Sequence, residues 1–167
     1  MSNLKFANYD VVFQEVPLET SLAIAISGCR IHCIGCHSRE LWEDKGEPLT
    51  IEAVEELLKK ERGVTCLLLM GGEHDIDALM PILMHFYKKI KTAWYCGLDM
   101  IPKDKVYILQ YLDFCKVGHY DHELGGLDSP TTNQKFYRIE HLSDGDYNMV
   151  DETYRFWRNQ QEAASEL

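Results

Sequence analysis

Apolar residues in this chain form short continuous runs that alternate with stretches of helical spacing, a pattern typical of an α/β protein. The apolar runs have strand length and predict core strands at 22–26, 65–70, 92–96 and 112–117. The stretches of helical spacing predict helices from the N-cap Thr50 to Gly63, over 76–90 and over 102–110. Strands and helices in this order predict a mainly parallel sheet with right-handed crossovers.

Two more strands are expected outside this core. One, over 9–16, ends at Pro17 and is predicted to lie at an edge of the sheet. The other, over 136–139, follows a turn-rich loop at 125–134. We therefore expect one domain over 1–140 and an extension over 141–167. Within the extension, Tyr154, Phe156 and Trp157 favour a short docked helix, and residues 160–167 favour a polar tail.

The length and charge of the chain narrow the architecture and the class of partner. With 167 residues it is shorter than the roughly 200 to 250 residues of a closed β/α barrel, so an open, partial barrel fits better. Its 17 basic and 27 acidic residues give a net charge of −10, which disfavours a nucleic-acid binder. We see neither a secretory signal nor an apolar run of about 18 residues, so we expect a cytoplasmic protein with no membrane partner.

The densest chemical signal is the loop after the strand at 22–26, where Cys29, Cys33 and Cys36 lie within eight residues. Cys thiolates are the usual protein ligands of iron–sulfur clusters, and a cubic four-iron cluster has four corners to fill. Three thiolates leave one iron open to a small molecule. The loop therefore predicts a [4Fe-4S] cluster at the carboxyl end of a core strand, where active sites of parallel α/β folds gather.

Two alternatives stay open for these thiols. Together with His32 or His37 they could bind zinc, although structural zinc sites usually combine two separated ligand pairs. A disulfide framework is possible because the chain has an even number of cysteines, six. The remaining three lie singly in apolar runs and are expected to be reduced core residues: Cys66, Cys96 and Cys115.

A second candidate element, Gly71-Gly72-Glu73, follows the strand at 65–70 and is expected at the same edge of the sheet. Adjacent glycines leave the main chain uncovered, so a ligand can approach it closely. The Glu73 carboxylate would suit an ammonium group. An ordinary strand-to-helix turn has the same appearance.

These two elements also carry a family resemblance. The residues concerned are Ser27-Gly28-Cys29, Cys33, Gly35-Cys36-His37, Trp42 and Gly71-Gly72-Glu73. They resemble the radical S-adenosylmethionine (SAM) superfamily and, within it, the small activating proteins of anaerobic ribonucleoside-triphosphate reductase. The resemblance covers roughly residues 20 to 138 and implies a partial, open β/α barrel of the radical SAM type. Many members have a bulky residue where this chain has Gly35; the reductase activators instead carry a ring just after the third Cys, here His37.

The resemblance implies two cofactors, a [4Fe-4S] cluster held by three Cys and SAM bound at its open iron. Residues 71–73 would accept the amino group of SAM, and His37, beside Gly35 and Cys36, would lie next to the adenine. Asn133, in the loop at 125–134, would close over the nucleoside or meet a partner.

The activity implied is that of an oxidoreductase. The reduced cluster would donate one electron to SAM, giving methionine and a 5′-deoxyadenosyl radical that removes a hydrogen atom from a glycine Cα. The partners implied are the large, glycyl radical subunit of the reductase and a reduced flavodoxin- or ferredoxin-like electron donor. Hydrogen-atom transfer needs no general base, so no His is assigned as one. Two alternatives remain: a radical SAM enzyme for a small molecule, of the carboxy-deazaguanine synthase type, and a non-enzymatic zinc or iron–sulfur module.

Overall fold

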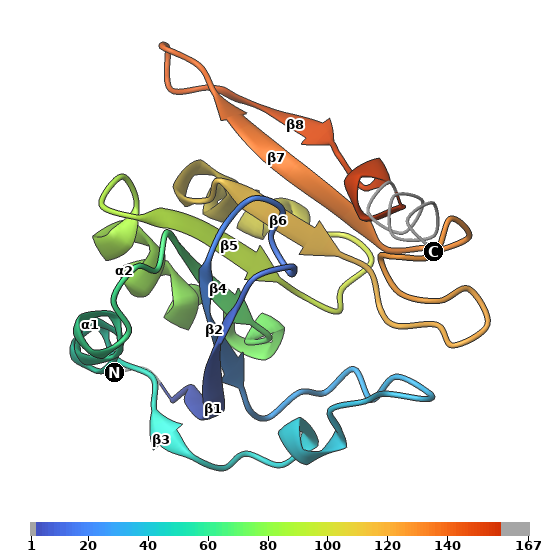
Figure 1. Ribbon diagram of the computed structural model, residues 1–167, viewed down its shortest axis with the longest axis horizontal. Helices are drawn as coiled ribbons and strands as arrows, with labels where there is room; N and C mark the ends of the chain where they lie inside the picture. Colours follow the sequence, from blue (N-terminus) through green and yellow to red (C-terminus); the bar gives the residue numbers. More distant parts are fainter. Residues whose placement is uncertain (1–2, 158–167) are drawn as a thin grey trace.

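The structure is a computed structural model that describes residues 3–157. Eight strands form a single sheet in the order β3-β1-β2-β4-β5-β6-β7-β8 (Figure 1). Their bounds are β1 Lys5–Val12, β2 Ser21–Ile26, β3 Glu47–Pro48, β4 Cys66–Met70, β5 Lys91–Tyr95, β6 Phe114–Val117, β7 Lys135–His141 and β8 Tyr147–Asp151. β3 and β8 pair on one side only, so the sheet is open and does not close into a barrel.

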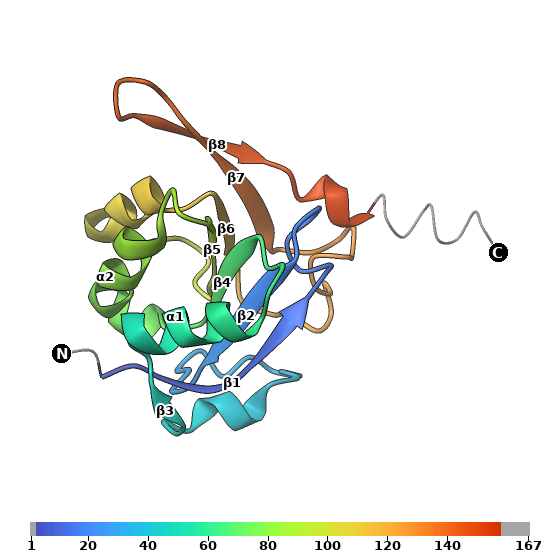
Figure 2. The same cartoon turned by 60° about the vertical axis from the view of Figure 1, so that its left-hand side comes forward.

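Two α-helices and three 3-10 segments connect the strands. They are α1 Ile51–Lys60, α2 Ile76–Phe86, η1 Arg39–Trp42, η2 Glu73–Asp75 and η3 Lys103–Tyr111. Figure 2 shows α1 and α2 on one face of the sheet and the C-terminal turn on its other side. No helix within residues 3–157 is long and apolar enough to cross a membrane.

The four central strands β2, β4, β5 and β6 run parallel, which confirms the α/β class and the predicted core strands. The expectation of a mainly parallel sheet holds for this centre alone. β1, β3, β7 and β8 all pair antiparallel, so the sheet is mixed. No crossover helix lies between β1 and β2 or between β7 and β8. Adjacent strands that are joined by a short connection run antiparallel.

Several element boundaries differ from the sequence prediction. β1 ends at Val12, so the expected strand over 9–16 is displaced toward the N-terminus. α2 ends at Phe86 because Tyr87 leaves the helical conformation, and the predicted helix over 102–110 is a 3-10 segment. β8 was not predicted, since most of its residues are exposed and no apolar alternation marks it.

The C-terminal residues dock against the sheet as a short helical turn over 154–157, as expected. Phe156 packs edge-on against Phe136, with ring centroids 5.2 Å apart. Trp157 Nε1 donates a hydrogen bond to the Leu127 carbonyl at 3.0 Å. The extension predicted from residue 141 contributes β8 to the sheet, and the expected polar tail at 160–167 lies outside the described residues.

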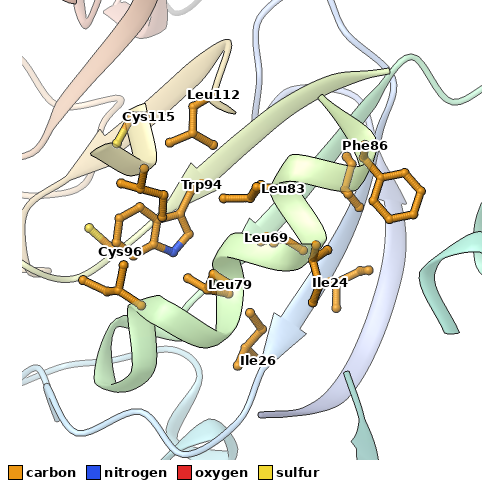
Figure 3. Packing of buried hydrophobic residues seen from close by; sticks show 14 of the residues in the cluster. Ile24, Ile26, Leu69, Leu79, Leu83, Phe86, Trp94, Cys96, Leu112 and Cys115 are labelled. Atoms are coloured by element: carbon orange, nitrogen blue, oxygen red, sulfur yellow. The ribbon is translucent and has the colours of Figure 1, made fainter. Parts of the chain in front are cut away.

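The main core lies between the sheet and α2 (Figure 3). Leu79 and Leu83 of α2 are fully buried beside Leu69 and Trp94 from the sheet. The Trp94 indole N–H donates to the Gly71 carbonyl at 2.7 Å. This bond ties the centre of the core to the turn that follows β4.

A second, smaller core covers the opposite face of the sheet. It includes Ala93, Tyr95 and Phe136 and is closed by Val16 and Phe156. At the carboxyl end of this face, register aligns a row formed by Ala25, Met70, Tyr95 and Lys116. Three members of the row are only partly buried. This end of the face is therefore more exposed to solvent than its centre.

Candidate functional site

The base of the Cys loop is fixed by the segment that leads to β3. Ser27 is buried, and its hydroxyl donates to the Lys45 carbonyl at 2.6 Å. The Cys29 amide donates to the Leu41 carbonyl at 2.8 Å. Gly28 adopts a φ of +83°, which lets the chain turn out of β2. The first thiol therefore starts from a well-defined position at the carboxyl edge of the sheet.

The three loop thiols are partly buried, and each contacts a different polar group. Cys29 Sγ lies 3.8 Å from Glu73 Oε1. Cys33 Sγ accepts the Tyr120 amide at 3.3 Å, and Cys36 Sγ accepts the Ser38 amide at 3.4 Å. Backbone amides of two separate segments thus point at two of the three thiols.

The glycines after β4 are required by the shape of the turn. Gly71 and Gly72 have φ angles of +100° and +81°. A Cβ on Gly71 would lie 3.1 Å from the Ile26 carbonyl oxygen, and one on Gly72 would lie 3.0 Å from Leu79 Cδ2. The turn packs directly against β2 and α2, and it presents Glu73 to the Cys loop.

Glu73 places a buried hydrogen-bond acceptor at the site. Its Oε2 atom is buried and has no hydrogen-bond partner within residues 3–157. Buried carboxylate oxygens are nearly always satisfied, because an unpaired one loses its hydration without compensation. A donor group bound at this position would satisfy it.

Lys116 is a site residue that sequence reasoning missed. Its ammonium lies 3.4 Å from the Cys96 carbonyl oxygen and is close enough to Glu73 and Cys33 to interact electrostatically. Burial lowers the pKa of Lys116, and the nearby thiols and the Glu73 carboxylate act in the opposite direction. The available signal was a single Lys inside the apolar run at 112–117.

The loop after β6 packs against the Cys loop. The rings of His37 and Tyr120 lie 5.4 Å apart, and a Cβ on Gly35 would lie 3.1 Å from His122 Cβ. Asn133 joins this loop from its other end, where its Nδ2 donates to the His119 carbonyl at 3.2 Å. Asn133 Oδ1 is buried and has no partner among the described residues. The sequence-predicted residues thus share one edge of the sheet, with Asn133 connected through residues 119–120.

A cavity of about 470 Å³ lies on the other side of Cys29. Its wall includes His74 and Trp42, and the Trp42 indole stacks on His32 at 4.2 Å. Two nitrogen atoms of this wall, Trp42 Nε1 and His74 Nδ1, are buried without partners in the described chain. Of the predicted metal ligands, Cys29 alone lines this cavity.

The geometry gives no support to the zinc and disulfide alternatives. All six cysteines are free thiols. Within residues 3–157, no three His, Cys, Asp or Glu side chains are placed to hold a single metal ion. The ring of His32 is stacked on Trp42, and that of His37 faces Tyr120.

Comparison with known families decides the class of the site. The model of a family described as a 4Fe-4S single cluster domain matches residues 20–139. The chain belongs to this family. Searches of curated proteins and of solved structures found no match. The predicted iron–sulfur cluster is therefore confirmed at the level of the family, and the matched segment spans the Cys loop and the loop that ends in Asn133.

The residues of this 4Fe-4S domain fit the cluster. Cys thiolates are the usual cluster ligands, and this loop offers three partly buried thiols, two of which accept hydrogen bonds from amide groups of two separate segments. The bulk of a four-iron cluster also explains why the thiols do not converge on one ion position. Cys29, Cys33 and Cys36 are the residues that would hold it.

The remaining cysteines should be chemically inert in the folded domain. Burial raises the pKa values of the Cys66 and Cys96 thiols to about 12, and it raises that of Cys115 well above its usual range. Only the thiolate reacts with alkylating agents, so these three should stay unmodified up to about pH 10. We expect iodoacetamide to label Cys33 and Cys36 in cluster-free, folded protein, as mapped by mass spectrometry. Labelling of Cys96 as fast as Cys36 without unfolding would contradict this assignment.

Proposed function

We propose that the chain is a radical SAM activating enzyme that generates a glycyl radical on the large subunit of an anaerobic ribonucleotide reductase. The supporting observation is the contact of Cys29 Sγ with Glu73 Oε1 at 3.8 Å, beside a carboxylate oxygen that lacks a partner. The proposed cluster ligand Cys29 thus lies next to an unsatisfied hydrogen-bond acceptor. An amino acid bound to the cluster would need such an acceptor for its amino group. The open sheet fits a partial barrel of the radical SAM type.

The bound cluster would supply the single electron that splits the sulfonium of SAM into methionine and a 5′-deoxyadenosyl radical. The chain's own residues bind and orient. Three thiolates leave one corner of a four-iron cluster without a protein ligand, which is where an amino acid can attach. In total, SAM, one electron and a glycine Cα–H would be converted to methionine, 5′-deoxyadenosine and a glycyl radical.

Two charged side chains suit the amino-acid end of SAM. Glu73 can accept a hydrogen bond from its amino group through the unpartnered Oε2. Lys116 can pair with its carboxylate, since its ammonium has one long contact to a carbonyl and faces the same site. A carboxylate and an ammonium of the protein thus complement the amino and carboxylate groups of SAM.

The nucleoside end of SAM would meet the loop after β6. Asn133 Oδ1 is a buried acceptor without a partner in the described chain, and His37 lies beside Tyr120. An amide and two rings suit an adenosine, which offers hydrogen-bond donors and a flat aromatic surface. No acid or base is assigned, because the transferred species is a hydrogen atom.

A protein substrate is favoured by the surface around the site. Three loops at this edge expose large apolar side chains, with Ile34 76%, Met100 73% and Leu124 37% exposed. Exposed apolar side chains on the loops beside a site are compatible with a protein partner. The reductase subunit is the proposed partner on this surface, and a flavodoxin- or ferredoxin-like protein is the proposed electron donor.

The alternatives differ in what they require. A small-molecule enzyme of the carboxy-deazaguanine synthase type would form its product without a reductase subunit. An electron-carrier or zinc module would not cleave SAM at all. One assay therefore separates all three.

The test is anaerobic reconstitution with iron and sulfide, reduction with dithionite and addition of SAM. We expect release of 5′-deoxyadenosine, with a glycyl radical signal that appears only when the reductase subunit is present. Cys33→Ala should lose both the cluster absorbance and cleavage, because two thiolates remain. Cys66→Ala, which alters a buried thiol far from the loop in sequence, should keep both. If Cys33→Ala retains cleavage, the ligand assignment is wrong.

The role of Lys116 has a separate test. A hydrogen bond between charged groups is worth about 1.5 to 3 kcal/mol, so Lys116→Met should weaken SAM binding about 10- to 100-fold. Decarboxylated SAM lacks the carboxylate, so the wild type should discriminate against it more strongly than the variant does. Lys103→Met, at an exposed position, is the matched control. Equal discrimination by wild type and Lys116→Met in equilibrium binding would refute the pairing.

A further inference from the structure

The middle of the Cys loop has an uncommon backbone conformation. His32 has a φ of +52°. Outside glycine, a positive φ costs free energy because Cβ comes close to the carbonyl oxygen that follows it, so the surrounding structure must hold it. His32 is exposed and lies directly before the thiol of Cys33. Whatever holds this residue therefore also holds the loop between the first two thiols.

Trp42 is the side chain that contacts the ring of His32. The two rings are stacked, with centroids 4.2 Å apart and planes inclined by 12°. Trp42 is itself fixed, because the carbonyls of its two neighbours accept hydrogen bonds from the amides of Gly28 and Cys29, at 3.2 and 2.8 Å. Trp42 Nε1 has no partner among residues 3–157, so the indole acts on His32 through its flat face.

The conformation at His32 brings two successive amides to the sulfur of Cys29. Burial raises the pKa of the Cys29 thiol, and hydrogen bonds from the backbone amides of Ile31 and His32 oppose this rise. Successive N–H groups at a left-handed residue form a concave site for anions, as found at many Fe–S centres. The Ile31 side chain packs on the loop after β5, where a Cβ on Gly97 would lie 3.0 Å from Ile31 Cγ1. The amide pair of residues 31 and 32 is thus held from two sides, by that loop and by Trp42.

We propose that Trp42 is a positioning residue for the cluster: by stacking on His32, it keeps the amide pair of residues 31 and 32 directed at Cys29 and so raises the reduction potential of the bound cluster. Reduction adds a negative charge, and hydrogen bonds to a ligand sulfur stabilise the reduced cluster more than the oxidised one. The proposal rests on Cys29 as a cluster ligand and not on SAM cleavage, so the two can fail separately.

Shielding from water would be a different role for Trp42, with the opposite effect. Trp42 and His32 line the cavity of about 470 Å³ that reaches Cys29. If the indole only kept water away, its removal would hydrate the cluster and raise the potential, because water favours the more negatively charged, reduced state. If it holds the amide pair, its removal lowers the potential. The sign of the shift therefore separates positioning from shielding.

Redox titration of the reconstituted full chain without SAM, followed by the electron paramagnetic resonance signal of the reduced cluster, tests the proposal. Trp42→Leu should lower the ratio of reduced to oxidised cluster about tenfold at a given potential, a shift of about 59 mV for one electron. Trp42→Phe keeps a flat ring and loses the unpartnered N–H, so its potential should stay close to that of the wild type.

Substitution of His32 isolates the backbone effect from other consequences of losing the indole. Glycine adopts a positive φ without steric cost, so the double variant Trp42→Leu, His32→Gly should recover most of the lost potential. Valine is β-branched and disfavours a positive φ, so His32→Val should lower the potential although Trp42 is intact. His32→Val also serves as the test if Trp42→Leu fails to fold, which circular dichroism of the cluster-free protein would show.

The proposal is overturned if the potential of Trp42→Leu rises, stays at the wild-type value, or falls without recovery in the double variant. A wild-type potential in folded His32→Val would overturn it as well. If Trp42→Leu binds no cluster, as measured by its iron and sulfide content, the double variant should regain one. A folded double variant that also stays empty would show that Trp42 acts by some means other than the conformation of His32.

Discussion

The site depends on the parallel pairing of β2 with β4. Because the two strands run side by side in the same direction, the loops at their carboxyl ends must start next to each other. Cys29 and Glu73 are 44 residues apart in sequence, yet their side chains come within 3.8 Å. A one-residue slip of this register would turn the residues of β4 to the opposite face of the sheet. The chemistry of the site is therefore a consequence of strand register.

The core holds that register through contacts that reach directly into the site. Trp94 is fully buried in the sheet, and its indole donates to the Gly71 carbonyl. Leu79 of α2 packs closely against Gly72, where a Cβ would lie 3.0 Å from Leu79 Cδ2. The turn before Glu73 is thus clamped between β5 and α2. In this 4Fe-4S domain, contacts of the apolar core therefore fix the position of the turn that carries Glu73.

The sequence was most informative where one local pattern decides the structure. The central strands are buried on both faces, so their apolar runs predicted them, and three cysteines on one loop predicted the cluster that the family match supports. β8 was missed because an exposed edge strand leaves no apolar pattern. Lys116 was missed because a sequence does not show toward which face of the sheet β6 turns this residue. Nor does it show that Cys33 and Glu73, on two loops distant in sequence, lie near it. Contacts such as that between the Tyr120 amide and Cys33 join residues 87 apart and leave no local signal.

We propose that three thiolates hold a four-iron cluster and leave one iron open to SAM. Electron paramagnetic resonance of the reduced, reconstituted domain, recorded with and without SAM, tests it most directly. We predict that SAM changes the g-values of the cluster signal, because its amino-acid end would bind the iron that lacks a thiolate. A cluster signal that is identical with and without saturating SAM would contradict the account.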